Sequence, residues 1–414
     1  MRAGGFMKYF LNFKLINKNK VKVIFIKEDN STYFNGGINY TFDWQTNDDQ
    51  KVLHQKLIQT INKLPEHAEL ITNVILDDSL FSSLSVKKMI LKINKNEINV
   101  DHFRDVRLTR IMDSKLNIEL SQLGDNNFYV HYPYIVTILK DNNLKVYRKI
   151  PTNKEFDVIT QYLNLYSFNK NEPVFVKIQN LLKQLKISKT NYLFRSQIIA
   201  STLNELKKPT LSIDLNSHYL NLNVINFGRL DDYQKLTVGT ANYLSKLTQI
   251  VSHLNKEELL MRLQYINKLS NSNLNKELVN DLNLRQLKYS LDQFMKVIAN
   301  LINQRLKEFS VRNNGKILTR LAFSGELAWI VDYLTKYFET NFQNLEVEIM
   351  RSNTSSEFQF SWYKDKLIEQ AVLLSNKFTK DNDQVQTQTS QIDLERITTK
   401  TFFQKIKEFI FKGV

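Results

Sequence analysis

Residues 211–230 read LSIDLNSHYLNLNVINFGRL and decide the fold. Leu211–Leu215 is a short apolar run typical of a buried strand, and it carries an acid, Asp214, near its end. The polar turn Asn216-Ser217-His218 follows, and a second strand, Leu220–Phe227, returns to an Asn-Phe-Gly turn. The stretch therefore predicts a strand pair with an acid beside its tight turn.

The segments on either side of this pair alternate between strand and helix patterns. Upstream, apolar alternation predicts strands at 9–15, 20–27, 32–44 and 70–76. In the same part, 3.6-residue spacing predicts helices at 48–63, 173–186 and 192–206. Downstream, the same reasoning gives helices at 236–254, 257–269, 287–309, 325–338 and 366–378, with strands at 317–323 and 345–350. The chain is therefore predicted to contain two α/β halves, each with an inserted subdomain.

The composition limits the function classes. The chain has 414 residues, a net charge of +15, no cysteine, 10 glycines and 5 prolines. The absence of cysteine excludes disulfides, thiolate metal sites and a cysteine nucleophile. No apolar run is long enough to span a membrane, and lysine is spread along the chain instead of forming one basic stripe. A nucleic-acid-binding scaffold is therefore only the third hypothesis, and a nucleic-acid partner is not expected.

The C-terminal part changes character. Residues 379–397 are polar and rich in Gln, which predicts a disordered linker. The final segment, 398–414, has an apolar stripe at helical spacing flanked by lysines: Phe402, Phe403, Lys405, Ile406, Phe409, Ile410 and Lys412. Such a helix favours binding to an anionic membrane surface, and the alternative is a helix that docks on this protein or on a partner.

The quoted stretch resembles the second phosphate motif of the actin-like ATPases, in which a strand, an Asp and a Gly-rich turn hold a metal-bound water and phosphate. Residues 238–244 resemble the segment that heads the following helix, residues 318–327 resemble the adenosine motif, and residues 257–262 resemble a purine-contacting helix. The resemblance implies an actin-like (ribonuclease H-like) two-lobed α/β fold with ATP and Mg as cofactors. The nucleotide-binding residues it implies are Asn12, Asp214, Asn216, Ser217, Gly239, Glu258, Arg262, Ser324 and Gly325.

Within this superfamily the chain is most similar to FtsA, the bacterial division protein that anchors FtsZ filaments to the membrane. FtsA has its insert in the first half, where residues 85–168 lie, and it ends in a linker and an amphipathic helix. The predicted boundaries are 1–84 and 169–210 for the first lobe, 85–168 for an FtsA-type insert, 211–251 and 310–378 for the second lobe, 252–309 for its insert, 379–397 for the flexible linker and 398–414 for the helix.

Several positions depart from the motifs. Residues 11–16 (LNFKLI) should form the first phosphate motif but contain neither an acid nor a glycine, and Asn12 occupies the expected acid position. Asn216, Ser217 and His218 replace small glycines, and bulky side chains there hinder the approach of backbone to phosphate. We therefore expect weak or absent nucleotide binding and hydrolysis, so the chain is not expected to be an enzyme. Asp214 is interpreted either as a metal-organising acid or as a turn-forming residue, and His218 as a turn residue.

The resemblance also implies partners. FtsA binds the acidic tail of FtsZ with its second-half insert, and the candidate contacts here are Arg285, Lys288, Tyr289, Lys296 and Arg305. Each of these is open to the alternative of a solvated basic face. The main hypothesis is an FtsA-like tether and self-associating scaffold for FtsZ on the cytoplasmic side of the cell membrane at the division site. The alternative is a functional actin-like ATPase that forms nucleotide-dependent filaments.

Overall fold

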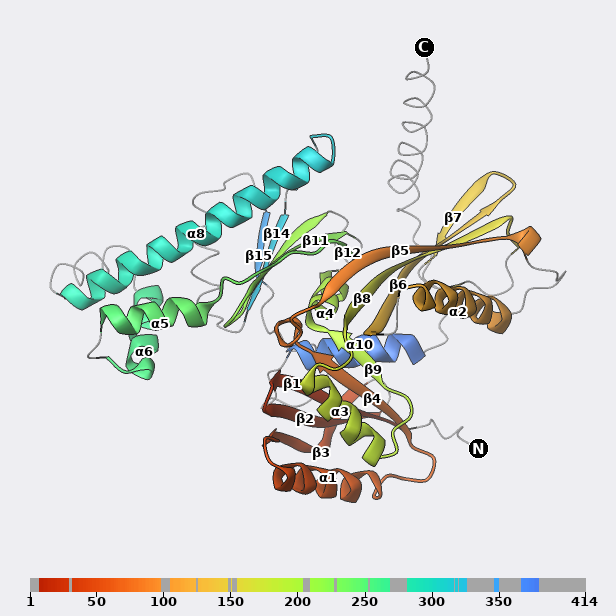
Figure 1. Cartoon of the computed structure of the whole chain (residues 1–414), viewed down its shortest axis with the longest axis horizontal. Helices are drawn as coiled ribbons and strands as arrows, with labels where there is room; N and C mark the ends of the chain where they lie inside the picture. Colours follow the sequence, from red (N-terminus) through yellow and green to blue (C-terminus); the bar gives the residue numbers. More distant parts are fainter. Residues whose placement is uncertain are drawn as a thin grey trace, which may run out of the picture. The chain divides into compact units, whose positions relative to one another are not determined.

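The computed structural model describes residues 7–29, 32–97, 105–123, 126–147, 150, 155–203, 209–226, 229–251, 254–268, 281–315, 317–318, 320–325, 346–349 and 366–379 (Figure 1). The chain forms two units, and each is described by itself. The first unit comprises Met1–Leu80 and Leu181–Ser375, and the second comprises Phe81–Asn180 and Asn376–Val414. The first unit contains two sheets, which we call the first and second lobes.

The first lobe is built on a sheet with the strand order β3-β2-β1-β4-β9. Its antiparallel part is β1 (Lys8–Asn17), β2 (Lys20–Asp29) and β3 (Thr32–Asp43), and β4 (Glu69–Leu76) and β9 (Asn191–Phe194) continue it in parallel. Helix α1 (Asn47–Ile61) begins at Thr46, whose side chain accepts from the Asp49 amide in a capping box. Helix α4 (Arg195–Thr202) follows β9 directly.

The second lobe repeats this arrangement with the order β12-β11-β10-β14-β15. The strands are β10 (Thr210–Leu215), β11 (Leu220–Asn226), β12 (Arg229–Asp232), β14 (Arg320–Gly325) and β15 (Glu346–Ile349), with β13 (Lys235–Leu236) paired to β11. As in the first lobe, the first three strands are antiparallel and the last two join in parallel. One sheet plan therefore occurs twice in the first unit.

Three helices supply the apolar core of the second lobe: α5 (Thr240–Ile250), α6 (Lys256–Lys268) and α8 (Leu282–Arg312). The β10 residues Leu211, Ile213 and Leu215 point into this core, where leucines and isoleucines of α8 meet them. Because side chains alternate along a strand, Ser212 and Asp214 lie on the opposite face of the sheet. This alternation places Asp214 on the polar face, away from α8.

The second unit contains a four-stranded antiparallel sheet with the order β5-β8-β6-β7. Its elements are β5 (Ser85–Asn94), β6 (Asn127–Lys140), β7 (Asn143–Tyr147), β8 (Val158–Asn169) and helix α2 (Asp105–Ser121), with a short 3-10 turn at Lys95–Glu97. Another 3-10 turn, Asp78–Leu80, ends the first segment of the first unit. Met112 and Leu116 of α2 pack with Leu91, Ile93 and other sheet residues in one core. Helices α3 (Pro173–Gln184) and α10 (Lys366–Thr379) both run across the division between the units along the chain.

Some local expectations differ from the structure. The predicted helix at 192–206 begins only at Arg195, because Asn191–Phe194 is strand β9, which pairs in parallel with Asn73–Leu76. The predicted helix at 236–254 begins at Thr240, since Lys235 and Leu236 pair with β11. In both cases hydrogen bonding to a distant strand overrides a local helical pattern.

Three predicted features lie outside the described residues. They are the linker beyond Thr379, the helix at 398–414, and the helix after Gly325. Within the described ranges, no helix is long and apolar enough to cross a membrane.

Candidate functional site

Asp214 lies at the carboxyl end of β10 and is bonded by four donors. Arg195, the first residue of α4, donates from Nε to Oδ2 at 2.8 Å and from Nη2 to Oδ1 at 2.9 Å. Asn216 Nδ2 donates to Oδ2 at 2.8 Å, and Ser324 Oγ donates to Oδ1 at 2.7 Å. Each carboxylate oxygen therefore accepts two hydrogen bonds within a bidentate ion pair.

The ion pair is buried. The Asp214 side chain is 1% exposed and that of Arg195 is 10% exposed. Burial raises the pKa of Asp214, but the charge and hydrogen bonds of Arg195 and the bonds from Ser324 and Asn216 outweigh it, so the net pKa is below its usual value. Burial lowers the pKa of Arg195, yet Asp214 holds it well above the ordinary value. Both groups are therefore charged across the physiological pH range.

This geometry does not fit a magnesium–nucleotide complex. The resemblance assigns Asp214 to a metal-bound water, but here a guanidinium occupies the position of the cation and the carboxylate oxygens are already engaged. In the described part of the chain, no cluster of three or more His, Asp or Glu could hold a metal ion. Of the two interpretations of Asp214, the structure favours neither the metal role nor a simple turn residue, because its main partner is Arg195.

The turn after β10 packs against the start of α5. The Thr240 amide donates to Asn216 O at 3.1 Å and the Ala241 amide donates to Ser217 O at 2.8 Å. A Cβ added to Gly239 would lie 2.2 Å from Ser217 O, so only glycine permits this approach. Amides at a helix N-terminus can bind a phosphate, but these two donate their hydrogen bonds to carbonyls of the chain itself. His218 is exposed in the turn, in agreement with its interpretation as a turn residue.

Asn12 does not occupy the expected acid position. It lies in the middle of β1, opposite Ile24, and its Oδ1 accepts from Asn73 Nδ2 at 2.8 Å. Asn73 Nδ2 also donates to Ser375 Oγ at 3.0 Å, and Asn191 Nδ2 donates to Asn73 Oδ1 at 3.0 Å. The prediction is corrected: Asn12 belongs to a buried amide row across β1, β4 and β9.

The register identifies the residue that corresponds to Asp214 in the first lobe. In the second lobe, Asp214 pairs with Asn221, and the next pair along the strands, Leu215 with Leu220, is the last before the turn. In the first lobe, Lys14 pairs with Lys22, and the next pair is Leu15 with Val21, after which a bulge interrupts the register. A lysine pair thus stands where a metal-binding acid would be needed.

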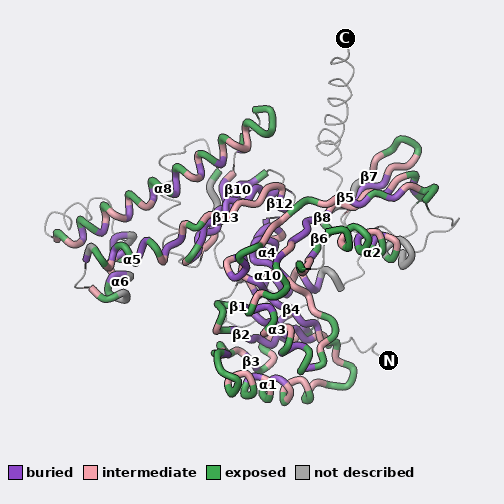
Figure 2. Tube along the Cα trace, viewed as in Figure 1, coloured by how far each residue is buried: buried purple, intermediate pink, exposed green. Residues whose placement is uncertain are grey.

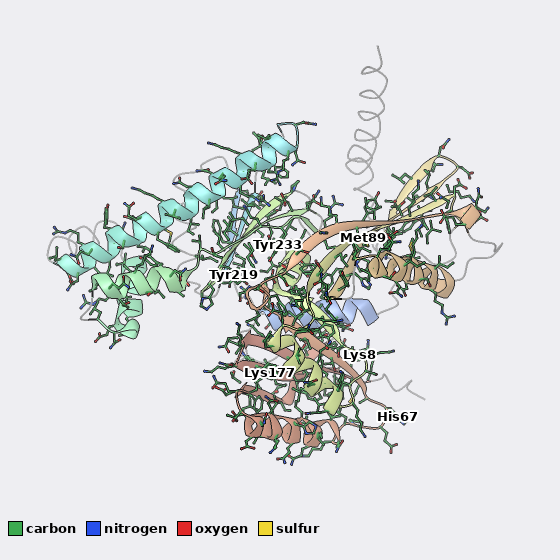
Figure 3. The ribbon with its side chains drawn as sticks, viewed as in Figure 1. Lys8, His67, Met89, Lys177, Tyr219 and Tyr233 are labelled. Carbon is green, nitrogen blue, oxygen red and sulfur yellow. The ribbon has the colours of Figure 1, made fainter. Side chains whose placement is uncertain are left out.

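Two carboxylates that the sequence reading did not select face the second lobe. Asp77 Oδ1 accepts from the Tyr219 hydroxyl at 3.0 Å, and Asp78 Oδ2 accepts from the Tyr233 hydroxyl at 3.2 Å. The Ser196 amide donates to Asp78 Oδ1 at 3.3 Å, and Lys235 Nζ donates to Asp78 O at 3.1 Å. Figure 3 labels both tyrosines. The available sequence signal was a pair of acids directly after a parallel strand.

Burial raises the pKa of Asp78 to about 6. The hydrogen bond from Ser196 opposes this rise, and the neighbouring charges of Asp77 and Asp214 add to it. With Arg195–Asp214, these contacts join the carboxyl ends of the two sheets by direct side-chain bonds. The two lobes therefore contact each other directly through side chains that follow β4 and β10.

The remaining predicted nucleotide residues have structural partners of their own. Glu258 caps α6 reciprocally with Asn255, and Arg262 pairs with Asp281, the N-cap of α8, at 3.3 Å. Gly325 ends β14. The structure therefore brings Asn216 and Ser324 onto Asp214, whereas Glu258 and Arg262 take part in helix capping and helix–helix pairing.

The predicted partner residues lie on α8 but differ in exposure. Arg285, Tyr289 and Lys296 are exposed, and Lys288 is half-buried with Asp292 as an ion-pair partner at 2.5 Å. Arg305 is 4% exposed, pairs with Asp232 and Glu308 and donates to Leu222 O. The prediction that Arg305 contacts a partner is therefore wrong, because its guanidinium is used inside the lobe.

Two sheets with one strand order, joined at their carboxyl ends, define the actin-like fold of two ribonuclease H-like lobes, as predicted. No family model and no curated protein match the sequence. Among solved structures, the chain is similar to one titled as the PilM–PilN type IV pilus biogenesis complex. The TM-score is 0.51 with 9% identity, covering 89% of this chain and 98% of that one.

Further matches of lower score include MreB5 of Spiroplasma citri bound to ADP (TM-score 0.43, 10% identity, 91% of this chain and 98% of that one). Another is a non-polymerising MamK mutant bound to AMPPNP (TM-score 0.40, 9% identity, 89% and 99%). At 9% identity, the likeness to the PilM–PilN structure establishes the actin-like fold and nothing finer.

Proposed function

We propose that this chain is an actin-like scaffold that works without nucleotide. The observation that carries the proposal is the buried Arg195–Asp214 ion pair, in which a permanent cation replaces the metal. Two further features support it: Lys14 stands at the register position of the first acid, and α5 donates its first amides to the turn after β10. An internal cation keeps the lobes joined at constant geometry, which suits a protein that assembles without a hydrolysis cycle.

Within this class we propose an FtsA-like tether that holds FtsZ filaments at the inner face of the cell membrane. The second unit supports this, because the chain leaves the first-lobe sheet after β4 and returns to it at β9, which makes the unit an insertion in the first half. The apolar and cationic sequence at 398–414 supports a membrane contact. Basic and aromatic residues on α8 support an acidic partner tail.

Liposome co-sedimentation tests the membrane part. Full-length protein and a chain cut after Arg396 are compared on vesicles containing anionic lipid, and the proposal expects pelleting of the full-length chain only. Equal pelleting of both chains would remove the anchor from the proposal. Phe403→Asp with Phe409→Asp is the matched full-length control, because it destroys the apolar stripe without shortening the chain.

Titration with an FtsZ tail peptide tests the partner. The proposal expects binding that weakens at least five-fold when Arg285→Ala and Lys288→Ala are combined. Unchanged affinity would remove these residues from the site. Lys51→Ala, in an exposed ion pair on α1, is the control for loss of a surface cation.

A second candidate is an adaptor that binds a different protein partner. It is favoured by the fold-level similarity to the structure of a PilM–PilN complex. An FtsZ tail that fails to bind, with liposome pelleting intact, would favour this candidate over the division role.

A further inference from the structure

Helix α8 carries large apolar side chains on two opposite sides. One side, with Leu284, Leu287 and Leu291 among its members, is buried in the second-lobe core. The other carries large apolar side chains in solvent: Leu282 is 64% exposed, Tyr289 67%, Val297 48% and Val311 81%. At about 100° per residue these four fall within one narrow stripe, roughly opposite the buried side. Figure 2 shows exposed residues recurring along the whole helix.

The exposed stripe is symmetrical about its centre. Its members follow the spacing of a helix-packing seam: Leu282, Gln286, Tyr289, Gln293, Lys296, Val297, Asn300, Gln304, Lys307 and Val311, all of them exposed. Counted from the midpoint between Lys296 and Val297, each position has a counterpart at the same distance on the other side. An antiparallel second copy would therefore place Leu282 against Val311 and Tyr289 against Gln304, twice by symmetry.

The pairing brings the exposed side chains of the N-terminal half, Leu282 and Tyr289, to the C-terminal half of the second copy. There α8 has a shallow, open depression lined by Asn300, Asn303, Gln304, Lys307, Glu308, Val311 and Arg312. Amides at Gln293 and Asn300 would face each other and can donate and accept in turn.

We propose that the outer face of α8 is a contact between two copies of this chain, packed antiparallel about an axis between Lys296 and Val297. The proposal rests on the self-association included in the proposed function and names its surface. The paired helices run for about 46 Å. In this pairing Lys296 lies opposite Val297 of the second copy, and Arg285 lies opposite Glu308, twice by symmetry, so opposite charges meet in the contact. Tyr289 and Lys296 also belong to the partner-tail surface, so a tail and a second copy exclude each other.

The absence of cysteine from the chain makes cross-linking a clean test. Val297→Cys should form a disulfide with its own copy on mild oxidation, at least ten-fold above Gln45→Cys, an exposed control on the first lobe. Leu282→Cys should not link to itself but should link to Val311→Cys when the two proteins are mixed. Self-linking of Leu282→Cys, or linking of Val297→Cys no better than the control, overturns the proposal.

A second measurement needs no cysteine. Sedimentation velocity should show a dimer, and Tyr289→Glu should weaken it at least ten-fold. If the protein assembles but Val297→Cys does not cross-link, self-association uses another surface; this inference is then overturned while the proposed scaffold stands. If the unmodified chain does not assemble at all, both the inference and the proposed scaffold are contradicted.

Discussion

Replacing Arg195 is the most informative perturbation of the interlobe network. Arg195→Met removes two charge-assisted hydrogen bonds from a carboxylate that is 1% exposed and leaves it without a counter-charge. Breaking a buried ion pair on one side costs about 3–5 kcal/mol, and two charge-assisted bonds at about 1.5–3 kcal/mol each give about 3–6 kcal/mol. We therefore expect the free energy of unfolding to fall by about 4 kcal/mol.

The assay is urea unfolding at pH 7, followed by tryptophan fluorescence, because Trp44 is buried in the first lobe. The double variant Arg195→Met with Asp214→Asn should recover at least half of the loss, since a buried amide needs no counter-charge. Lys51→Met, which breaks an exposed pair on α1, should cost less than about 0.5 kcal/mol. A loss at Arg195 no larger than that at Lys51 would refute the reasoning.

The pH dependence of this pair has a defined sign. The folded-state pKa of Asp214 is lowered, so its stabilisation is present above the unfolded value of 3.8 and is lost only as pH falls through the folded pKa. In Arg195→Met the burial that raises the pKa of Asp214 is no longer opposed by the guanidinium, so the difference in unfolding free energy from the parent chain should shrink as pH falls from 7.

Three other variants test separate parts of the account. Asp78 has its pKa raised from 3.8 to about 6, so the parent chain should lose about 3 kcal/mol as pH rises from 4 to 7. Asp78→Asn should flatten that part of the stability–pH curve, and an unchanged curve would contradict the assignment. Gly239→Ala should lower the unfolding free energy by at least about 2 kcal/mol in urea unfolding, because its Cβ meets Ser217 O, whereas Gly315→Ala, with open space but a φ of +80°, should cost about 1. Arg305→Met should lower the unfolding free energy by about 2–4 kcal/mol without selectively weakening the binding of a tail peptide. If it instead weakened peptide binding and left stability unchanged, Arg305 would be a partner contact after all.

Much of the fold could be predicted from local pattern. The alternation in residues 211–227 fixed the strand pair and put Asp214 on the polar face, opposite Leu211 and Ile213. Helix α8 was recognisable from its apolar spacing, although its start at Leu282 depends on the Asp281 cap. Strand β9 was not recognisable, because four residues become a strand only through pairing with β4.

The site was harder to predict because its key contacts join distant parts of the chain. Arg195 precedes Asp214 by 19 residues and lies on another element, and no local spacing announces that the two side chains meet. Asn12 was misplaced because the motif was counted along the sequence, whereas the β1–β2 register shows that Lys14 holds the corresponding position. The scarcity of glycine at these turns led to the expectation of weak or absent nucleotide binding, which stays a prediction.

The most direct test of nucleotide independence is isothermal titration of the full-length chain with Mg-ATP. Because Arg195 is paired with Asp214 and the first amides of α5 donate hydrogen bonds to the turn after β10, we expect no saturable heat up to about 1 mM nucleotide. Assembly measured by sedimentation should be the same with Mg-ATP as after its removal by apyrase. Saturable micromolar binding, or assembly that requires ATP, would contradict the account.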